Sequence, residues 1–281
     1  MTASAVAPVS VARRPLRDPS AILAELDAGR LRAAHPDADA PGGWRVDPMA
    51  KEAILACFAD RTTRDWDLGV FQFRDRVGLP PKALLNGRHA RAALDAGRPW
   101  RIVPGGTTIR AGVWLGHGVV VMPPSFVNVG AWIGDDAMID SHVLVGSCAQ
   151  IGARVHLAAG VQIGGVLEPP GARPVIVDDD AFVGANCGLF EGVLIGRSAV
   201  LAAGVTLTGT SRLYDLVREH VLVGSQEEPL AVPPGSVVVP GSRAIDGPFA
   251  LEHGLSLSTA VIVKERDPGT DARVALEAAL R

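Results

Sequence analysis

The sequence predicts a mainly β fold: a left-handed parallel β-helix of hexapeptide repeats, with a small helical part before it and a short strand and helix after it. Two observations predict this. One aliphatic residue recurs every six positions from Ile109 to Leu207, and a second residue, usually small or β-branched, follows each of them by four positions. A period of six does not fit an α-helix, whose apolar stripe repeats every 3.6 residues, but fits three short strands per coil joined by tight turns.

The aliphatic series runs through ten positions without a slip, breaks once, and continues through six more. Burial of each member contributes roughly 1.5 to 3 kcal/mol, so this column dominates the stability of the prism. Glycine often follows the aliphatic residue, which leaves room at the corners of the coil. The members are Ile109, Leu115, Val121, Val127, Ile133, Ile139, Val145, Ile151, Leu157, Ile163, Val177, Val183, Leu189, Ile195, Leu201 and Leu207.

The break in the series predicts a loop that leaves the prism. The step from Ile163 to Val177 is fourteen residues, which is two more than two repeats. The extra residues fall in the proline-rich stretch Glu168–Pro174.

The chain divides into four predicted segments: a flexible N-terminus (1–19), a mainly helical domain (20–100), the β-helix (101–241), and a C-terminal strand and helix (242–281). Ser20 is expected to cap a first helix, and Asp47-Pro48 to begin a second. Residues 214–229 are expected to be irregular. Ala260–Lys264 is expected to form a strand, and a helix near 271–281 to end the chain.

Composition excludes several classes of function. The net charge is −3 and no Lys/Arg cluster is interleaved with aromatic residues, so neither nucleic acid nor a membrane surface is an expected partner. No run approaches the roughly 18 apolar residues of a membrane span. Cys57, Cys148 and Cys187 form no CxxC pair, so reduced structural thiols in the cytoplasm are expected.

The open ends and flat faces of a prism favour a homotrimer.

Several motifs cover most of residues 100 to 264, and the longer ones are far more specific than a generic hexapeptide. They are RIVP (101–104), MPPSFVNVGA (122–131), MID (138–140), VGSCAQIG (145–152), VQIGGVLEP (161–169), EG (191–192), PGSVVV (234–239) and AVIVK (260–264). Together these motifs resemble those of the tetrahydrodipicolinate N-succinyltransferases of the diaminopimelate and lysine pathway.

The resemblance implies an acyltransferase that moves the succinyl group of succinyl-CoA to the amino group of ring-opened tetrahydrodipicolinate, 2-amino-6-oxopimelate. Succinyl-CoA is then a co-substrate, with no permanently bound cofactor and no metal. The functional residues carried over by position are a substrate-binding arginine at Arg101 and two catalytic carboxylates at Asp140 and Glu191.

The chemistry of these residue types suits those roles. A guanidinium is a natural clamp for a dicarboxylate acceptor, which favours Arg101. Asp140 stands where the repeat usually has glycine, so its side chain should point outward at a corner and contact the substrate. A carboxylate with the reference pKa of about 3.9 is a poor acceptor for an ammonium proton, so Asp140 is expected to orient the amine.

A count of residues around the coil places Glu191 about one prism face away from Asp140, with the two extra residues removed. A site that uses both carboxylates would then span two subunits. The coenzyme is expected in the groove between adjacent prisms, where Gly204 allows close approach and Lys264 is available for its phosphates.

Other functions remain open at this point. The stretch Gly184–Phe190 lacks the arginine and serine that the family commonly carries after the alanine, so an acetyl-CoA-dependent N-acetyltransferase of the same or a related amino acid is the alternative. A histidine base, at His142 or His156, is a weaker possibility than turn histidines without a role. A zinc carbonic anhydrase is disfavoured because His117, His142 and His156 fall at three different places in the coil. An ice-binding prism would need a broader threonine face.

Overall fold

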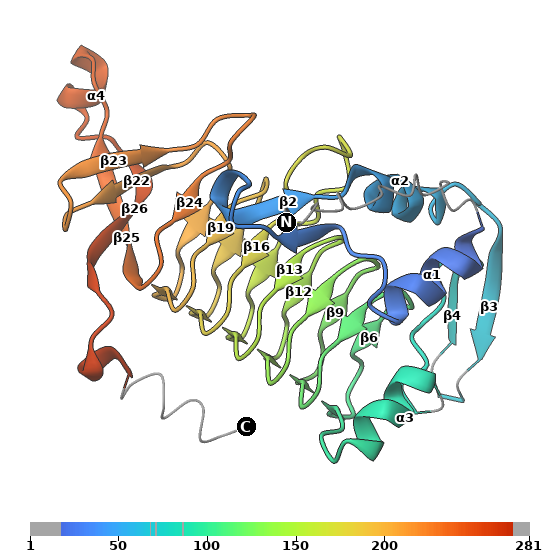
Figure 1. Ribbon diagram of the computed structural model, residues 1–281. Helices are drawn as coiled ribbons and strands as arrows, with labels where there is room; N and C mark the ends of the chain where they lie inside the picture. The colour runs from blue at the N-terminus through green and yellow to red at the C-terminus, as the bar shows by residue number, and fades with distance from the viewer. Residues whose placement is uncertain (1–17, 68, 71, 86, 272–281) are drawn as a thin grey trace, which may run out of the picture.

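The computed structural model describes residues 18–271 except 68, 71 and 86, and its centre is a prism of three parallel sheets (Figure 1). Each coil contributes one two-residue strand to each sheet in turn. We call these sheet 1, sheet 2 and sheet 3 in the order in which the chain meets them. The predicted left-handed parallel β-helix is thereby confirmed.

The strands follow the six-residue period. Sheet 1 contains β5 (Arg101–Ile102), β8 (Val120–Val121), β11 (Met138–Ile139), β14 (His156–Leu157), β17 (Phe182–Val183), β20 (Val200–Leu201) and β25 (Ser236–Ala244). Sheet 2 contains β6 (Thr108–Ile109), β9 (Phe126–Val127), β12 (Leu144–Val145), β15 (Gln162–Ile163), β18 (Gly188–Leu189) and β21 (Thr206–Leu207). Sheet 3 contains β7 (Trp114–Leu115), β10 (Trp132–Ile133), β13 (Gln150–Ile151), β16 (Ile176–Val177), β19 (Leu194–Ile195) and β24 (Ala231–Val232).

The predicted aliphatic series forms the core of the prism. All sixteen members are at most 3% exposed, and they belong to one continuous cluster with most of the second, smaller series. The second residue of each strand points inward and the first points outward, because side chains alternate along a strand. Ile139, for example, is fully buried between Val121 and Leu157.

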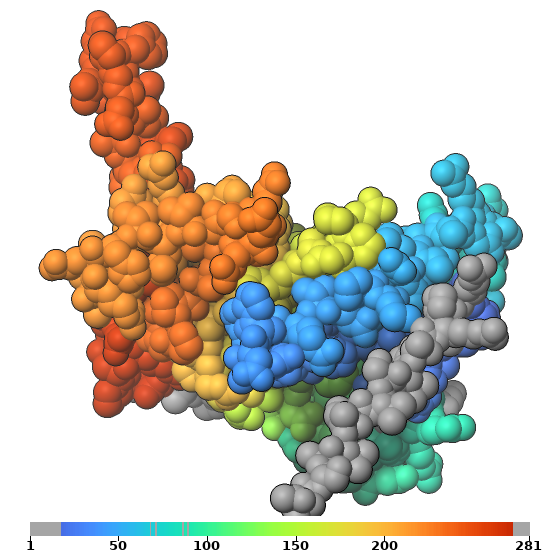
Figure 2. Space-filling model, turned by 45° about the horizontal axis from the view of Figure 1, so that its top comes forward, coloured from blue at the N-terminus to red at the C-terminus, as the bar shows by residue number. Residues whose placement is uncertain are grey.

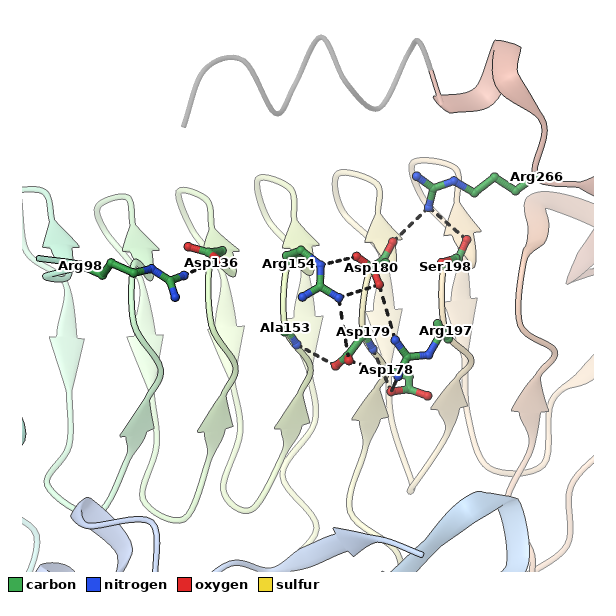
Figure 3. A network of polar contacts seen from close by, with 10 residues as sticks. All are labelled: Arg98, Asp136, Ala153, Arg154, Asp178, Asp179, Asp180, Arg197, Ser198 and Arg266. Carbon is green, nitrogen blue, oxygen red and sulfur yellow. Dashed lines mark hydrogen bonds and ion pairs between the residues drawn. The ribbon is translucent and has the colours of Figure 1, made fainter. Parts of the chain in front are cut away.

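The corner between sheets 3 and 1 carries a ladder of charged side chains (Figure 3). Arg154 pairs with Asp180 at 2.6 Å, and Arg197 contacts Asp179 at 3.1 Å. The Asp179 carboxylate also accepts the backbone N–H of Ala153, so adjacent coils are joined at their turns. Glycine is required in this corner: a Cβ at Gly152 would lie 2.6 Å from Asp179 Oδ1.

The loop that leaves the prism is longer than the spacing suggested. Gln150 pairs with Ile176, 26 residues later, whereas neighbouring rungs such as Trp132 and Gln150 are 18 apart. β16 therefore follows β15 directly in the prism, and the excursion adds eight residues to one repeat. The expectation of two repeats plus two residues is wrong, because the spacing between Ile163 and Val177 does not show whether a further hexapeptide of the prism lies between them.

A second excursion was not predicted. Residues 214–229 were expected to be irregular, but β22 (Arg212–Asp215) and β23 (His220–Val223) form an antiparallel hairpin. β26 (Ser256–Glu265) pairs with both β22 and β25, so a strand much longer than the expected 260–264 completes this sheet. The outer parts of β25 and β26 continue beyond the prism as an arm, with α4 (Pro248–Glu252) at its tip (Figures 1 and 2).

The described part before the prism contains helices at both predicted places, a third helix that was not predicted, and two strand pairs that were not predicted. The helices are α1 (Pro19–Asp27), α2 (Pro48–Ala56) and α3 (Arg88–Asp95). β1 (Ala34–Pro36) pairs with β2 (Trp44–Val46), and β3 (Thr63–Asp67) pairs with β4 (Gln72–Arg76). Asp47 caps α2 as predicted, but Asp18 caps α1 in place of Ser20, because Pro19 already occupies the first helical position.

The remaining expectations about the ends of the chain lie largely outside the described residues: the flexible segment up to residue 17, and the terminal helix from 272 onward. The division of the chain at residues 19, 100 and 241 stays a prediction. Within the described part, no helix combines the length and apolar character needed to cross a bilayer.

Buried cations fasten the N-terminal part to the prism. Lys82 donates to Asp27 at 2.5 Å and to the carbonyl oxygen of Val113, and its side chain is 3% exposed. Burial lowers the pKa of Lys82, although the nearby Asp27 opposes this shift.

A second buried cation, Arg32, lies over the ring of Trp132 and donates to Gln150. Burial lowers the pKa of Arg32 to about 10. These contacts cover the outer face of sheet 3.

Replacement of the Lys82 counter-charge should destabilise the protein. Asp27→Asn leaves a buried ammonium group without an anion, so we expect a loss of about 2 kcal/mol, below the range for fully buried pairs because Asp27 is 31% exposed. Urea unfolding measures this loss. The matched control is Asp65→Asn, which breaks a pair with Arg74 that is about 70% exposed and should leave the midpoint nearly unchanged. Equal effects of the two substitutions would contradict this account.

Candidate active site

Asp140 lies at the corner between sheets 1 and 2, directly after β11. Its Oδ1 accepts the backbone N–H of Ser141 at 2.7 Å, and its carbonyl oxygen accepts the hydroxyl of Ser125 at 2.8 Å. The residue is half-buried, and no cation among the described residues pairs with it. The partly exposed carboxylate therefore lies at a corner of the prism, and its contact with a ligand stays a prediction.

Arg101 belongs to the same face. It is the first residue of β5, is exposed, and heads the outward-facing column that continues through Val120 and Met138. Asp140 follows Met138 by two residues, two rungs away from Arg101. Because rungs are about 4.8 Å apart, two rungs correspond to about 10 Å along the axis of the prism. No ion pair involves Arg101 in the described part of the chain, so its guanidinium can bind a carboxylate.

Gly204 lies at the same corner as Asp140, three coils further along, in the turn after β20. Its φ is +79°, which favours glycine, and a Cβ placed on it would meet no atom within 4 Å. The position is therefore open to solvent and to a ligand that lies along the corner. The close approach expected of the coenzyme is sterically allowed, and the contact itself stays a prediction.

Lys264 lies on β26, opposite Val237 of β25. Its ammonium group donates to Asp267 at 2.6 Å, and this bond holds the pKa of Asp267 well below its usual range. Lys264 thus already has an anionic partner within its own chain. A phosphate would have to compete with Asp267 for it, which weakens the expectation that Lys264 is free to bind the coenzyme.

Glu191 lies at the next corner, between sheets 2 and 3, two residues after the end of β18. It is exposed, and sheet 2 separates it from the corner of Asp140. Within one chain the two carboxylates do not meet. The sequence count placed them one face apart, and the structure does the same, although the loop length used in that count was wrong.

The stretch that departs from the family pattern supplies an aromatic ring beside Glu191 and no cation. The Phe190 ring covers two glycines, Gly188 in β18 and Gly164 just after β15: a Cβ on Gly188 would lie 2.6 Å from its Cε2 atom, and one on Gly164 would lie 2.8 Å from its Cδ1 atom. Sequence reasoning missed this contact, because Phe190 occupies an outward position that carries no motif.

The three histidines occupy three separate places. His117 lies at the corner between sheets 3 and 1, and His142 at the corner between sheets 1 and 2. His156 is 2% exposed on sheet 1, where its ring meets that of Phe182 edge-on. It is therefore not the exposed turn histidine that was expected. The described residues contain no cluster of three metal-ligating side chains.

Comparisons with known proteins agree with this architecture. Residues 130–165 match the model of the bacterial transferase hexapeptide, and residues 174–209 match the hexapeptide repeat of succinyl-transferase. Both matched segments lie in the prism, and both models describe hexapeptide repeats of transferases.

Similar proteins of known name identify the family within the transferases. A 2,3,4,5-tetrahydropyridine-2,6-dicarboxylate N-succinyltransferase of Dechloromonas aromatica is 37% identical over 93% of this chain and 88% of its own. Enzymes of the same name from Idiomarina loihiensis (39%, over 92% of this chain and 87% of theirs) and Rhodopseudomonas palustris (40%, over 91% and 86%) are similarly close. The chain belongs to the family of 2,3,4,5-tetrahydropyridine-2,6-dicarboxylate N-succinyltransferases.

The cysteines offer no nucleophile for an acyl-enzyme. All three are free and buried. Burial raises the pKa of Cys57 and Cys187 to about 11 and that of Cys148 to about 12, so the reactive thiolate is scarce near neutral pH. This agrees with the predicted structural role of these thiols.

The thiols should resist alkylation in the folded protein. With iodoacetamide near neutral pH, we expect no modification of the native chain over a period in which a free thiol reacts completely, because reaction requires the thiolate and access. Denaturation should expose all three. Mass spectrometry counts the adducts, and rapid alkylation of Cys187 in the native protein would show that its raised pKa and burial are wrongly assigned.

Proposed function

We propose that this chain transfers the succinyl group of succinyl-CoA to the amino group of 2-amino-6-oxopimelate, the ring-opened hydrate of tetrahydrodipicolinate, in diaminopimelate and lysine biosynthesis in the cytoplasm. The observation that carries the proposal is the identity of 37–40% to enzymes of that name over more than nine-tenths of the chain. The outward groups at the corners of the prism support it.

The proposed reaction is a direct transfer. The acceptor nitrogen, after loss of its ammonium proton, attacks the thioester carbonyl carbon to give a tetrahedral intermediate. The C–S bond then breaks, the nitrogen gives up a second proton as the amide forms, and coenzyme A leaves as a thiolate that takes up that proton to become a thiol. No covalent intermediate with the protein is needed, which agrees with the buried cysteines.

Each proposed residue has a defined part in this step. Arg101 binds a carboxylate of the acceptor by paired N–H donation. Asp140 accepts a hydrogen bond from the acceptor amine and fixes its direction toward the thioester, because Ser125 holds its backbone carbonyl and the Ser141 N–H holds its carboxylate. Glu191 is the second catalytic carboxylate. Gly204 leaves room for the coenzyme along the corner, and Lys264 is a weaker candidate for its phosphates.

The assembly we propose is a homotrimer with active sites between subunits. The N-terminal part covers sheet 3, whereas the outward residues of sheet 2 are largely open: Thr108 and Thr206 are exposed, and Leu144 is half-buried. Sheet 2 is bounded by the two corners that carry Asp140 and Glu191. In a cyclic trimer, the Asp140 corner of one copy can face the Glu191 corner of the next.

The arm gives a second reason for association. A two-stranded hairpin is at best marginally stable when isolated in water, and this one extends away from the prism (Figure 2). Its outer part exposes large apolar side chains to solvent, which favours burial against another copy of the chain. These are Phe249, Leu251, Leu255 and Leu257.

The donor is the first point to test. With 2-aminopimelate as a stable acceptor, we expect thiol release from succinyl-CoA at least tenfold faster than from acetyl-CoA, and a loss of most of this activity in Asp140→Ala. Arg64→Ala, on the exposed β3–β4 hairpin, is the matched control and should be unaffected. Equal or faster use of acetyl-CoA would replace the proposed donor, and no turnover with either would show that the acceptor is wrong.

Sites shared between subunits predict complementation. Chains with Asp140→Ala and chains with Glu191→Ala are each expected to keep only a small residual activity, but trimers assembled from a mixture should recover part of the lost activity. Some of their sites combine an intact Asp140 from one copy with an intact Glu191 from another. The mixture is compared with each parent after the same dissociation and reassembly. Activity no higher than that of the parents would place both carboxylates outside a common site.

A further inference from the structure

The turn that carries Glu191 has a backbone unlike the other corners. At most corners one residue with positive φ closes the turn, three places after the buried aliphatic residue, as His142 does after Ile139. After Leu189, two consecutive residues have positive φ: Glu191 at +55° and Gly192 at +74°. A residue other than glycine rarely adopts a positive φ, so the surroundings must hold the Glu191 backbone in this conformation.

The cause lies in the coil below. At regular corners, the residue that closes a turn donates its N–H to the turn one coil earlier, as Arg154 does to Asp135 at 2.7 Å. Below Glu191 the chain leaves the prism in the loop between β15 and β16, so a regular turn is missing from the stack at that point. The turn of Glu191 and Gly192 therefore needs another support.

Arg173, at the end of that loop, supplies the support. Its Nε donates to the carbonyl oxygen of Gly192 at 2.9 Å, and its Nη2 donates to the carbonyl oxygens of Pro229 and Leu230. Pro229 and Leu230 immediately precede β24, where the chain re-enters the prism. One guanidinium thus joins the ejected loop, the Glu191 turn and the end of the second excursion.

Arg173 is held firmly. It is 8% exposed, and burial lowers its pKa while the charge of Glu228 opposes that shift. The fit around it is tight: a Cβ on Gly192 would lie 2.5 Å from the Arg173 carbonyl oxygen, and one on Gly42 would lie 2.7 Å from Arg173 Nη1. A group so enclosed cannot move without moving Gly192.

We propose that Arg173 is a positioning residue for Glu191: it holds the Gly192 carbonyl, maintains the two-residue turn, and so directs the Glu191 carboxylate toward the reacting groups. The inference rests on the proposed catalytic role of Glu191. Arg173 itself does not touch the substrate. The three segments that it joins explain why this loop keeps a buried cation.

The test is a double-mutant cycle on kcat for thiol release from succinyl-CoA with 2-aminopimelate. Arg173→Gln should lower kcat by between about ten- and a hundredfold, the effect of a small misplacement of a reacting group, with KM for succinyl-CoA little changed. In the Glu191→Gln background, the same substitution should cause no further loss, because the group it positions is already gone. Arg173→Lys keeps one donor and should retain an intermediate kcat.

The controls separate positioning from folding. Arg154→Gln removes an arginine that bonds to Asp180 at a different corner (Figure 3) and should leave kcat unchanged. If Arg173→Gln does not fold, Arg173→Lys is measured alone and with Glu191→Gln, and the same disappearance of its effect is expected. An unchanged kcat for Arg173→Gln, or losses that multiply in the double variant, would overturn the inference.

The outcome also distinguishes failure of the inference from failure of the function. No turnover by the wild-type chain would contradict the proposed function. Full activity of Glu191→Gln in an active enzyme would remove the role of Glu191 and the inference with it. With both of these intact, multiplicative losses contradict the positioning role of Arg173 alone.

Discussion

Burial of one aliphatic side chain every six residues is the constraint on which the rest of the structure depends. Because each of these side chains must reach the same central column, every coil has to turn at the same three corners. Side chains can then vary without disturbing the core at the corners and at the outward positions of the strands. Asp140, Glu191 and Gly204 all occupy such positions, so the proposed chemistry is placed where the fold tolerates it.

The repeat made most of the prism predictable from sequence. Sixteen aliphatic positions and the corner position of Asp140 follow from a period of six, because strand alternation decides which side chains are buried. Interruptions of the period were less predictable. The loop before β16 and the β22–β23 hairpin were misjudged, since a break in a repeat shows that the chain leaves the prism but not where it returns.

The candidate site was predictable only where it resembled a known family. Arg101, Asp140 and Glu191 stand in matching motifs, and geometry alone would have left each as an ordinary surface residue. Arg173 carries no such signal: it lies in a loop between proline and alanine, and its partners are backbone carbonyls 19 and 56 or more residues away. Contacts of this kind depend on the path of the whole chain, so local sequence patterns do not reveal them.

The central claim is that one site uses Asp140 from one copy of the chain and Glu191 from the next. A crystal structure with 2-aminopimelate and coenzyme A bound tests it most directly. The account predicts a trimer in which the acceptor amine lies within hydrogen-bonding distance of Asp140 of one subunit, with Glu191 of a neighbouring subunit facing the same nitrogen. An acceptor bound by residues of a single chain, or far from both carboxylates, would contradict it.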